Sequence, residues 1–403
     1  MTTAERATGP APLRRPLTPN AAVGPNGWRP QRLGSAIALA AVLLGTQTLA
    51  ASTPLPVDVR LLLPSEGLLA GLGDGLRRGY GLAMQQSAIC GAKPPSLQLG
   101  WLPPGGDPSA ALRASSRSAL LVAPPAAPLE IYGQLADQQR LTVLLPLQRG
   151  RSLEGLPQLR GSDRLWPLVP GRSLEADRLA QALLADGIRR VMVVRDRSAE
   201  SSALSDRFVT SYANGNGQVI GPTAAPIPLQ AGDQGALGQL ATDVDWYRPP
   251  ALVVLTAPGS PLARAIRAAH WPAGLLLAWP FRIPGPLAQA QLGVDPFSRG
   301  PGWDRFSRSF AQRWGYRPGL VESAGYDTGQ IAALASVKVA GGSGWTLQWF
   351  GSKGQPLPLC AALRQRQAGG SVRPQGATSR FDLSAATSPT ADLRLSRAAA
   401  RQP

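Results

Sequence analysis

Hydrophobic positions along the chain alternate between short apolar runs and longer stretches with one apolar face. The run at 57–64 predicts a buried strand, and Ser65, Glu66 and Gly67 follow it as a turn into a helix. Apolar residues at three- and four-residue steps define one face of that helix. They are Leu69, Leu72, Leu76, Tyr80 and Met84. Ser65 is suited to cap this helix, and Glu66 to interact with its positive end.

The same alternation continues to about residue 279. Further strands are predicted at 96–101, 119–123, 141–145, 190–194, 218–220, 251–255 and 275–279. Further helices are predicted at 109–116, 129–139, 234–242 and 261–269. One more helix is predicted to begin at Ser173, and another to contain Phe208 and Tyr212. Strand, helix and strand in succession predict an α/β protein with parallel sheets. With 403 residues, two domains are expected rather than one.

The N-terminal 50 residues have the pattern of an export signal. Arginines at 14, 15, 29 and 32 precede an apolar stretch at 33–45, and small residues follow at 48–51. We therefore predict a basic disordered arm and signal peptide at 1–50, with cleavage near Ala50 and a periplasmic location. The alternative is an uncleaved inner-membrane anchor, and only in that case is the membrane a partner. The last residues, 396–403, are predicted to be a disordered tail.

The net charge of +17 comes almost wholly from arginine. Such a charge attracts polyanions, but the arginines are scattered and are not interleaved with aromatic residues, as single-strand binding requires. We therefore predict a solvated basic surface and no nucleic-acid partner.

Cysteine and histidine, which are common in catalytic and metal sites, are scarce, and paired carboxylates stay open. Cys90 and Cys360 are the only cysteines, and they can form one disulfide or remain two buried thiols. His270 is the only histidine, and the glycines at 71–75 lack dinucleotide-binding spacing. We predict no catalytic residue, no metal ligand and no cofactor, and hence a protein that is not an enzyme.

Three segments together resemble the type I periplasmic-binding fold, in the branch of branched-chain amino-acid receptors. They are 63–67 with 79–83; 177–221; and 306–314 with 316–318 and 325–328, the last being similar to a glycine-tyrosine-aspartate helix start. A shorter likeness lies at 380–382, and the resemblance spans roughly 57–390.

The resemblance implies two Rossmann-like lobes with parallel sheets, joined by a three-segment hinge. Lobe 1 is expected to take 57–167 plus 275–340, and lobe 2 to take 168–274 plus 341–395. It also implies an extracytoplasmic solute-binding protein that captures a small polar solute, such as an amino acid, an amide or a short peptide. Its partners would be this small-molecule ligand and an ABC permease in the inner membrane.

Ligands of open α/β sheets bind outside the carboxyl ends of the strands. The residues expected there are Ser65, Glu66, Ser198, Thr256, Trp279, Tyr326 and Asp327. Other roles stay open, because Ser65 and Asp327 also suit helix caps, while Trp279 and Tyr326 also suit a core.

One segment departs from the family pattern. The loop at 123–127 reads Ala-Pro-Pro-Ala-Ala, where amino-acid receptors usually place serine or threonine hydroxyls. Proline also removes backbone N–H donors. A second function therefore stays open, namely an envelope scaffold or a regulator of cell-wall enzymes with a vestigial cleft.

Overall fold

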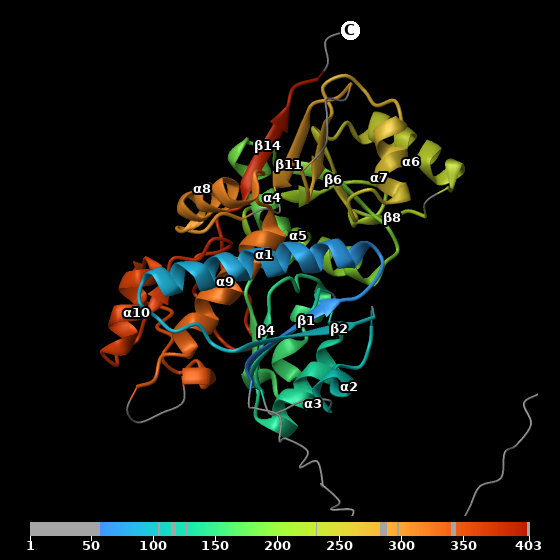
Figure 1. Cartoon of the computed structure of the whole chain (residues 1–403). Helices are drawn as coiled ribbons and strands as arrows, with labels where there is room; N and C mark the ends of the chain where they lie inside the picture. The colour runs from blue at the N-terminus through green and yellow to red at the C-terminus, as the bar shows by residue number, and fades with distance from the viewer. Residues whose placement is uncertain are drawn as a thin grey trace, which may run out of the picture. The chain divides into compact units, whose positions relative to one another are not determined.

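The computed structural model describes residues 57–400, apart from 104, 114–117, 126, 231, 283–287, 296–297 and 340–343. The predicted signal peptide at 1–50 lies outside the described residues. No helix in the described ranges has the length and apolar content needed to cross a membrane. The described chain forms two large, mostly parallel sheets, each covered by helices on both faces (Figure 1). This confirms the predicted fold class.

The first lobe is built on a five-stranded parallel sheet of order β2-β1-β3-β4-β5. Its strands are β1 (Val57–Pro64), β2 (Leu97–Leu102), β3 (Ser118–Val122), β4 (Thr142–Leu145) and β5 (Leu165–Pro167). Its helices are α1 (Leu68–Ile89), α2 (Pro108–Arg113), α3 (Leu129–Gln139), α8 (Trp303–Trp314), α9 (Leu320–Ala335) and α10 (Leu359–Gln367). A short parallel pair, β12 (Pro356–Leu357) and β13 (Arg373–Pro374), lies beside α10 in the sequence.

The second lobe is built on a sheet of order β14-β11-β10-β9-β6-β7, with β8 also paired to β6. Its strands are β6 (Arg190–Arg195), β7 (Gln218–Val219), β8 (Ile227–Pro228), β9 (Ala251–Leu255), β10 (Leu276–Trp279), β11 (Gln291–Asp295) and β14 (Arg394–Ala398). Its helices are α4 (Ser173–Ala185), α5 (Ala199–Asn214), α6 (Gln234–Tyr247) and α7 (Pro261–Ala268). Only β14 runs antiparallel to its neighbour.

The lobe boundaries differ from those predicted. β10 pairs with β9 and with β11, so β10 and β11 belong to the second sheet and not to lobe 1. Conversely, Leu347, Leu363 and Phe381 are buried in one core with β1 and α1, so this region does not belong to lobe 2. The predicted tail is also corrected, because β14 occupies 394–398. An apolar run predicts a strand, but it does not encode which sheet the strand joins.

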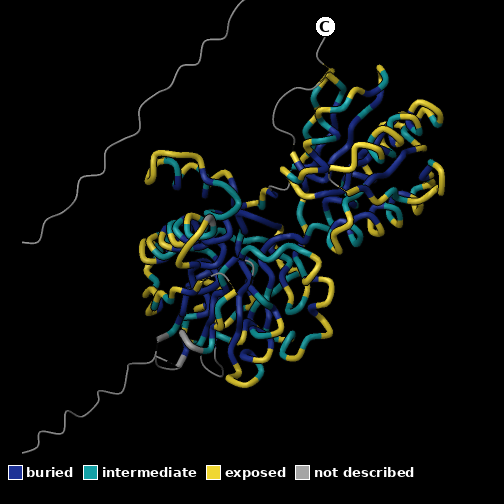
Figure 2. The backbone as a smooth tube through the Cα atoms, turned by 90° about the vertical axis from the view of Figure 1, so that its right-hand side faces the viewer, coloured by how far each residue is buried: buried dark blue, intermediate teal, exposed yellow. Residues whose placement is uncertain are grey.

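With these assignments, the chain passes between the two lobes three times. The passages follow β5, β11 and Phe381 along the sequence. Buried residues follow the strands of each lobe, as the dark blue segments of Figure 2 show. Each lobe therefore has its own hydrophobic core.

Helices α1 and α9 approach each other closely because glycines stand at their contact. A Cβ atom on Gly79 would lie 1.9 Å from the carbonyl oxygen of Glu322, and one on Gly325 would lie 2.1 Å from that of Leu76. Both neighbours are backbone atoms and cannot turn away. Gly79 and Gly325, which lie in the family-like segments at 79–83 and 325–328, thus serve helix packing.

This packing predicts opposite effects for two neighbouring substitutions. Gly79→Ala should lower the free energy of unfolding by about 3 kcal/mol, because the added methyl group overlaps the backbone of α9. Gly81→Ala should raise it by up to about 1 kcal/mol, since a Cβ at Gly81 meets nothing within 4 Å and alanine favours helix. Urea unfolding of the two variants measures both effects, and equal effects would refute the close approach.

The two cysteines form a disulfide, which settles the alternative left by the sequence. Cys90 follows the last residue of α1, and Cys360 lies in the first turn of α10. The bond joins two elements of the first lobe that are 270 residues apart in the sequence.

Candidate ligand site

Two predicted site residues come together at the carboxyl ends of β6 and β9. Thr256, fully buried, donates a short hydrogen bond to Asp196 Oδ2 and lies 2.8 Å from the hydroxyl of Ser260. The backbone N–H of Ser198 donates to Asp196 Oδ1 at 2.8 Å, and the Ser198 hydroxyl caps α5 by accepting from Ser201 N–H. Asp196 therefore holds the two strand ends together.

The electrostatics of Asp196 reflect these contacts. Burial alone would raise its pKa, but the hydrogen bonds from Ser198 and Thr256 favour the charged form more strongly, so the pKa lies below its ordinary value. A depressed pKa in the folded state stabilises the protein above the unfolded pKa, and that stabilisation is lost as the pH falls.

Replacing Asp196 should reveal this pH dependence. We expect Asp196→Asn to lower the free energy of unfolding by about 2 kcal/mol at pH 7, because charge-assisted hydrogen bonds are lost. The difference from the wild type should shrink as the pH falls through the acidic range. Denaturant unfolding at pH 7 and at pH 3.5 measures it. A difference that is constant with pH would show that Asp196 is not charged in the folded protein.

Trp279 and Tyr326 lie in hydrophobic cores. Trp279 is completely buried in the second lobe beside Phe281. Tyr326 packs 4.8 Å from the ring of Phe306, and its hydroxyl donates to Gln86 Oε1 at 2.6 Å. Both side chains thus take the structural role that the sequence left open for them.

Asp327 is fully buried and holds the segment at 377–378, which precedes the third passage. Its carboxylate accepts hydrogen bonds from the backbone N–H groups of Ala377 at 2.7 Å and Thr378 at 2.9 Å, and from the Thr378 hydroxyl at 2.6 Å. Burial raises the pKa of Asp327 to about 6, and the hydrogen bonds counter that rise. Helix α9 begins at Leu320, two turns earlier than the resemblance implied, so Asp327 is not a helix cap.

The segment at 377–378 also contacts the first and the second passage. The Thr378 hydroxyl also lies 3.3 Å from the carbonyl oxygen of Leu168, on the first passage. Gly300, on the second passage, donates its N–H to Ala377 at 2.9 Å. Asp327 thereby holds Ala377 and Thr378, which in turn contact the first and second passages.

Ser65 and Glu66 are exposed at the carboxyl end of β1. Ser65 does not cap α1, because the N-cap position is Gly67, whose φ of 69° is readily adopted by glycine. Around them the first-lobe strand ends are apolar. A small crevice there is lined by Pro64, Leu102, Pro103, Pro124 and Pro125, among others.

A cavity with several charged side chains in its lining lies between elements of the two lobes. It has a volume of about 260 Å³ and is lined from the loop after β4, the starts of α4 and α5, and the third passage. Its charged lining residues are Arg149, Arg151, Glu154, Arg172 and Glu200. The first turns of two helices border it, and helix N-termini offer backbone N–H donors to an anion.

Two arginines of this cavity, Arg149 and Arg172, form ion pairs with the buried Glu175. Arg149 Nη2 lies 2.6 Å from Oε1 of Glu175, and Arg172 contacts both Glu175 at 3.5 Å and Glu200 at 2.9 Å. Glu175 is almost fully buried, and burial raises its pKa although both arginines oppose the rise. Arg172 also reaches the carbonyl oxygen of Thr256 at 3.5 Å, which connects this cavity to the Asp196 cluster.

Arg149, Arg172 and Glu200 were not predicted from the sequence, whereas Asp196 lies within 195–198, a segment expected at the carboxyl end of a strand. The signal for Asp196 was its place two residues after the predicted strand 190–194 and two residues before Ser198. For the arginines there was none, because 41 Lys and Arg residues are spread along the chain.

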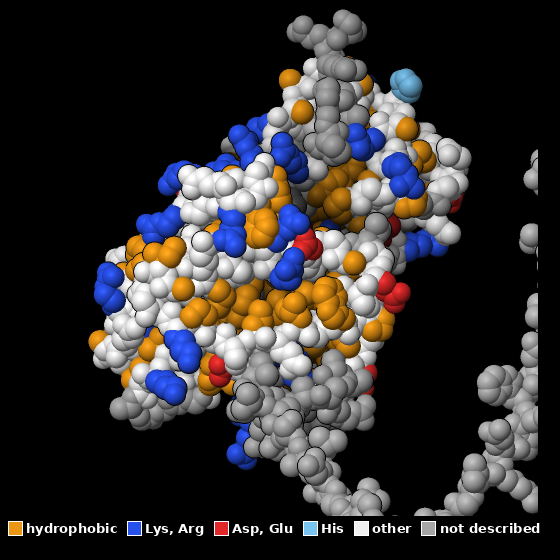
Figure 3. Space-filling model, in the orientation of Figure 1, with side chains coloured by type: hydrophobic (Ala, Val, Ile, Leu, Met, Phe, Trp, Pro, Cys, Tyr) orange, Lys and Arg blue, Asp and Glu red, His pale blue; other side chains and the backbone are white. Residues whose placement is uncertain are grey.

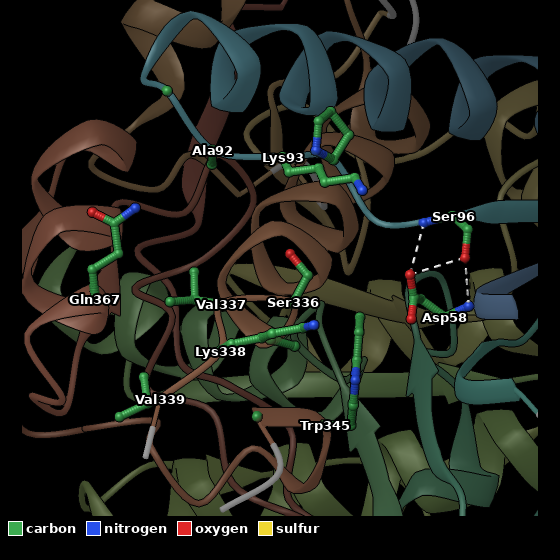
Figure 4. A pocket seen from close by; sticks show the side chains of 14 residues that line it. Asp58, Ala92, Lys93, Ser96, Ser336, Val337, Lys338, Val339, Trp345 and Gln367 are labelled. Carbon is green, nitrogen blue, oxygen red and sulfur yellow. Dashed lines mark hydrogen bonds between the residues drawn. The ribbon is translucent and has the colours of Figure 1, made fainter. Parts of the chain in front are cut away.

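A larger cavity, of about 1050 Å³, lies at the opposite end of the first sheet (Figure 4). Asp58 and Ser96, which are hydrogen-bonded to each other at 2.9 Å, stand at the amino ends of β1 and β2. Lys93 and Lys338 extend along its wall. Because ligands of parallel sheets bind at the carboxyl ends, we place the candidate site at the smaller cavity.

No family model matches the chain, and no curated protein does. Solved structures match over most of its length. A solute-binding protein from R. palustris in complex with benzoate is 18% identical, with a TM-score of 0.55 over 84% of this chain and 92% of that one. A branched-chain amino-acid ligand-binding protein from Burkholderia xenovorans is 15% identical, with a TM-score of 0.60 over 85% and 90%.

A third structure, a substrate-binding protein from Desulfitobacterium hafniense in complex with Leu, is 14% identical, with a TM-score of 0.60 over 85% of this chain and 98% of that one. The chain therefore has the fold of type I periplasmic binding proteins. The three matched proteins are solute-binding components of ABC transporters, which confirms the resemblance at the level of the fold.

Proposed function

We propose that this protein is an exported receptor that binds a small polar solute between its lobes and delivers it to an ABC permease of the inner membrane. The observation that carries the proposal is the cavity of about 260 Å³, because its lining comes from both lobes and from their passages. The disulfide supports the exported location, since such bonds persist in oxidising compartments.

The charges around the cavity favour a solute that bears a carboxylate. Three arginines and two glutamates line it, which suits a molecule with an anionic group and a hydrogen-bond donor, such as an amino acid or a short peptide. Two of the similar structures contain benzoate and Leu, both carboxylates. Ser198 and Thr256 on the second lobe, with Ser65 and Glu66 on the first, remain the proposed additional contacts.

A thermal-shift panel tests this proposal. The probes are amino acids, benzoates, short peptides and uncharged amides, at concentrations far above typical dissociation constants. We expect one carboxylate to raise the melting temperature by several degrees, because a ligand that binds only the folded state stabilises it. No shift with any carboxylate would reject the proposal.

The site itself is tested with a matched pair of variants. Arg151 is exposed and lines the cavity, so Arg151→Gln should weaken binding about tenfold or more without changing the melting temperature of the free protein. Arg190→Gln is the control, because Arg190 is equally exposed but stands at the amino end of β6. Equal binding by both variants would place the ligand elsewhere.

The envelope-scaffold function remains the alternative, and one observation favours it. The first-lobe strand ends offer prolines and apolar side chains where a solute receptor commonly offers hydrogen bonds. The absence of a thermal shift with every probe, together with capture of one specific envelope protein, would support this second function.

A further inference from the structure

Strand β2 forms a free edge of the first sheet. It pairs with β1 and with no other described strand. Val59 N–H donates to the carbonyl oxygen of Ser96 at 3.0 Å, and Ser65 N–H donates to that of Leu102 at 2.8 Å. Because backbone groups alternate in direction along a strand, the even-numbered residues of β2 face β1. The N–H and C=O groups of residues 97, 99 and 101 therefore point outward at the edge.

The side chains of the same three residues form an exposed apolar row. Leu97 is 41% exposed, Leu99 36% and Trp101 57%. Their partners in register on β1, which are Val59, Leu61 and Leu63, are completely buried in the core beneath α1. Figure 3 shows hydrophobic side chains gathered in a band just below α1, where β2 lies in Figure 1. The apolar face of the sheet thus continues past its helical cover.

Edge strands of soluble proteins usually carry charges, prolines or bulges that prevent pairing with another chain. β2 contains no charged residue and no proline from Leu97 to Leu102. Its row is also symmetric, with leucine at the centre and one large apolar residue two positions away on each side. Such a pattern is complementary to itself under a two-fold rotation.

We propose that two copies of the protein associate through antiparallel pairing of their β2 strands. A two-fold axis at Leu99 places Leu99 opposite Leu99 of the second copy, and Leu97 opposite its Trp101. In this register all the outward backbone groups of residues 97, 99 and 101 find partners, and the apolar rows meet on one face. The two five-stranded sheets become one ten-stranded sheet.

No register shifted by a single residue does the same. A shift by one residue would set the outward groups of one strand against residues whose own groups already face β1. A symmetric pairing centred on Leu97 or on Trp101 would leave part of each row unpaired. The chemistry of the edge therefore selects a second copy of this chain in one register.

Cross-linking tests this register. In Leu99→Cys the two thiols face each other across a hydrogen-bonded pair, whose Cα separation of about 5.5 Å suits a disulfide. Mild oxidation should give a covalent dimer on a non-reducing gel. Leu97→Cys is the matched control, because its thiol faces Trp101 of the second copy. This variant should remain monomeric on the gel. Equal cross-linking of both variants, or of neither, would overturn the proposal.

Light scattering after size exclusion tests the association itself. The wild type should have twice the mass of one chain. The Leu99→Lys variant should have the mass of one chain, because two ammonium groups would meet at the two-fold axis and repel each other. Trp246→Lys should remain a dimer, since Trp246 is 81% exposed on α6 of the second lobe. A wild type that is monomeric at about 100 µM would overturn the proposal. The exposed apolar row of β2 would then be a surface for a different partner.

Discussion

The Asp327→Asn variant should lose about 3–5 kcal/mol of unfolding free energy. Asp327 accepts four hydrogen bonds, from Ala377, from the N–H and hydroxyl of Thr378, and from Gln330 at 3.2 Å. In asparagine an NH2 group replaces one of the two carboxylate oxygens, and this donor would face the donors of Ala377 or Thr378. Removing one partner of a buried, charged network carries a cost of this size. The midpoint of urea unfolding measures the loss.

Asp163→Asn provides the control for the Asp327 variant. The Asp163 side chain is 77% exposed, and its nearest arginine nitrogen lies 3.9 Å away. Its replacement should change the free energy of unfolding by less than about 0.5 kcal/mol. If both variants unfold at the same urea concentration, Asp327 does not hold the segment at 377–378.

The second large effect is expected from the disulfide. Replacing both Cys90 and Cys360 with serine should lower the free energy of unfolding by about 5 kcal/mol. The reason is that the bond closes a loop of 270 residues in the unfolded chain, and this closure removes much of its conformational entropy. Urea unfolding with and without a reductant measures the effect.

The double-serine variant contains its own control. Dithiothreitol should destabilise the wild type to the level of the variant, and it should leave the variant unchanged. A wild type that is insensitive to reductant even when unfolded and refolded in its presence would contradict the role given to Cys90–Cys360.

The secondary structure was predictable where one local pattern decides it. The segments 57–64, 129–139 and 251–255 have the predicted bounds, because their apolar spacing matches a strand or a helix over the whole element. Strands β5, β11 and β14 were missed. β5 has three residues, and β11 and β14 carry polar or charged residues at sheet edges or near them.

The lobe assignment could not be read from the sequence. β10 is apolar and almost fully buried, as residues 61–63 of β1 are, so either sheet would accept it. Its pairing with β9 depends on the chain's path between the two lobes. The sequence of one segment does not encode that path.

The candidate site was predictable in part. Ser198 and Thr256 lie together at the carboxyl edge of the second sheet, where the strands they follow had placed them, and their contact with a ligand stays a prediction. Arg149 and Arg172 were missed, since their role arises from burial around Glu175 and not from a motif. Asp327 was predicted to contact the ligand or to cap a helix. In the structure its carboxylate accepts hydrogen bonds from the backbone of Ala377 and Thr378.

The proposed capture of a solute between two lobes is tested most directly by the distance between the lobes. Spin labels on Glu130→Cys in the first lobe and Asp245→Cys in the second, both exposed positions, report it by double electron–electron resonance. A saturating carboxylate from the thermal-shift panel should shift and narrow the distance distribution, as hinge closure requires. A pair within the first lobe, Glu130→Cys with Lys93→Cys, should not change. Identical distributions with and without the bound carboxylate would contradict the account.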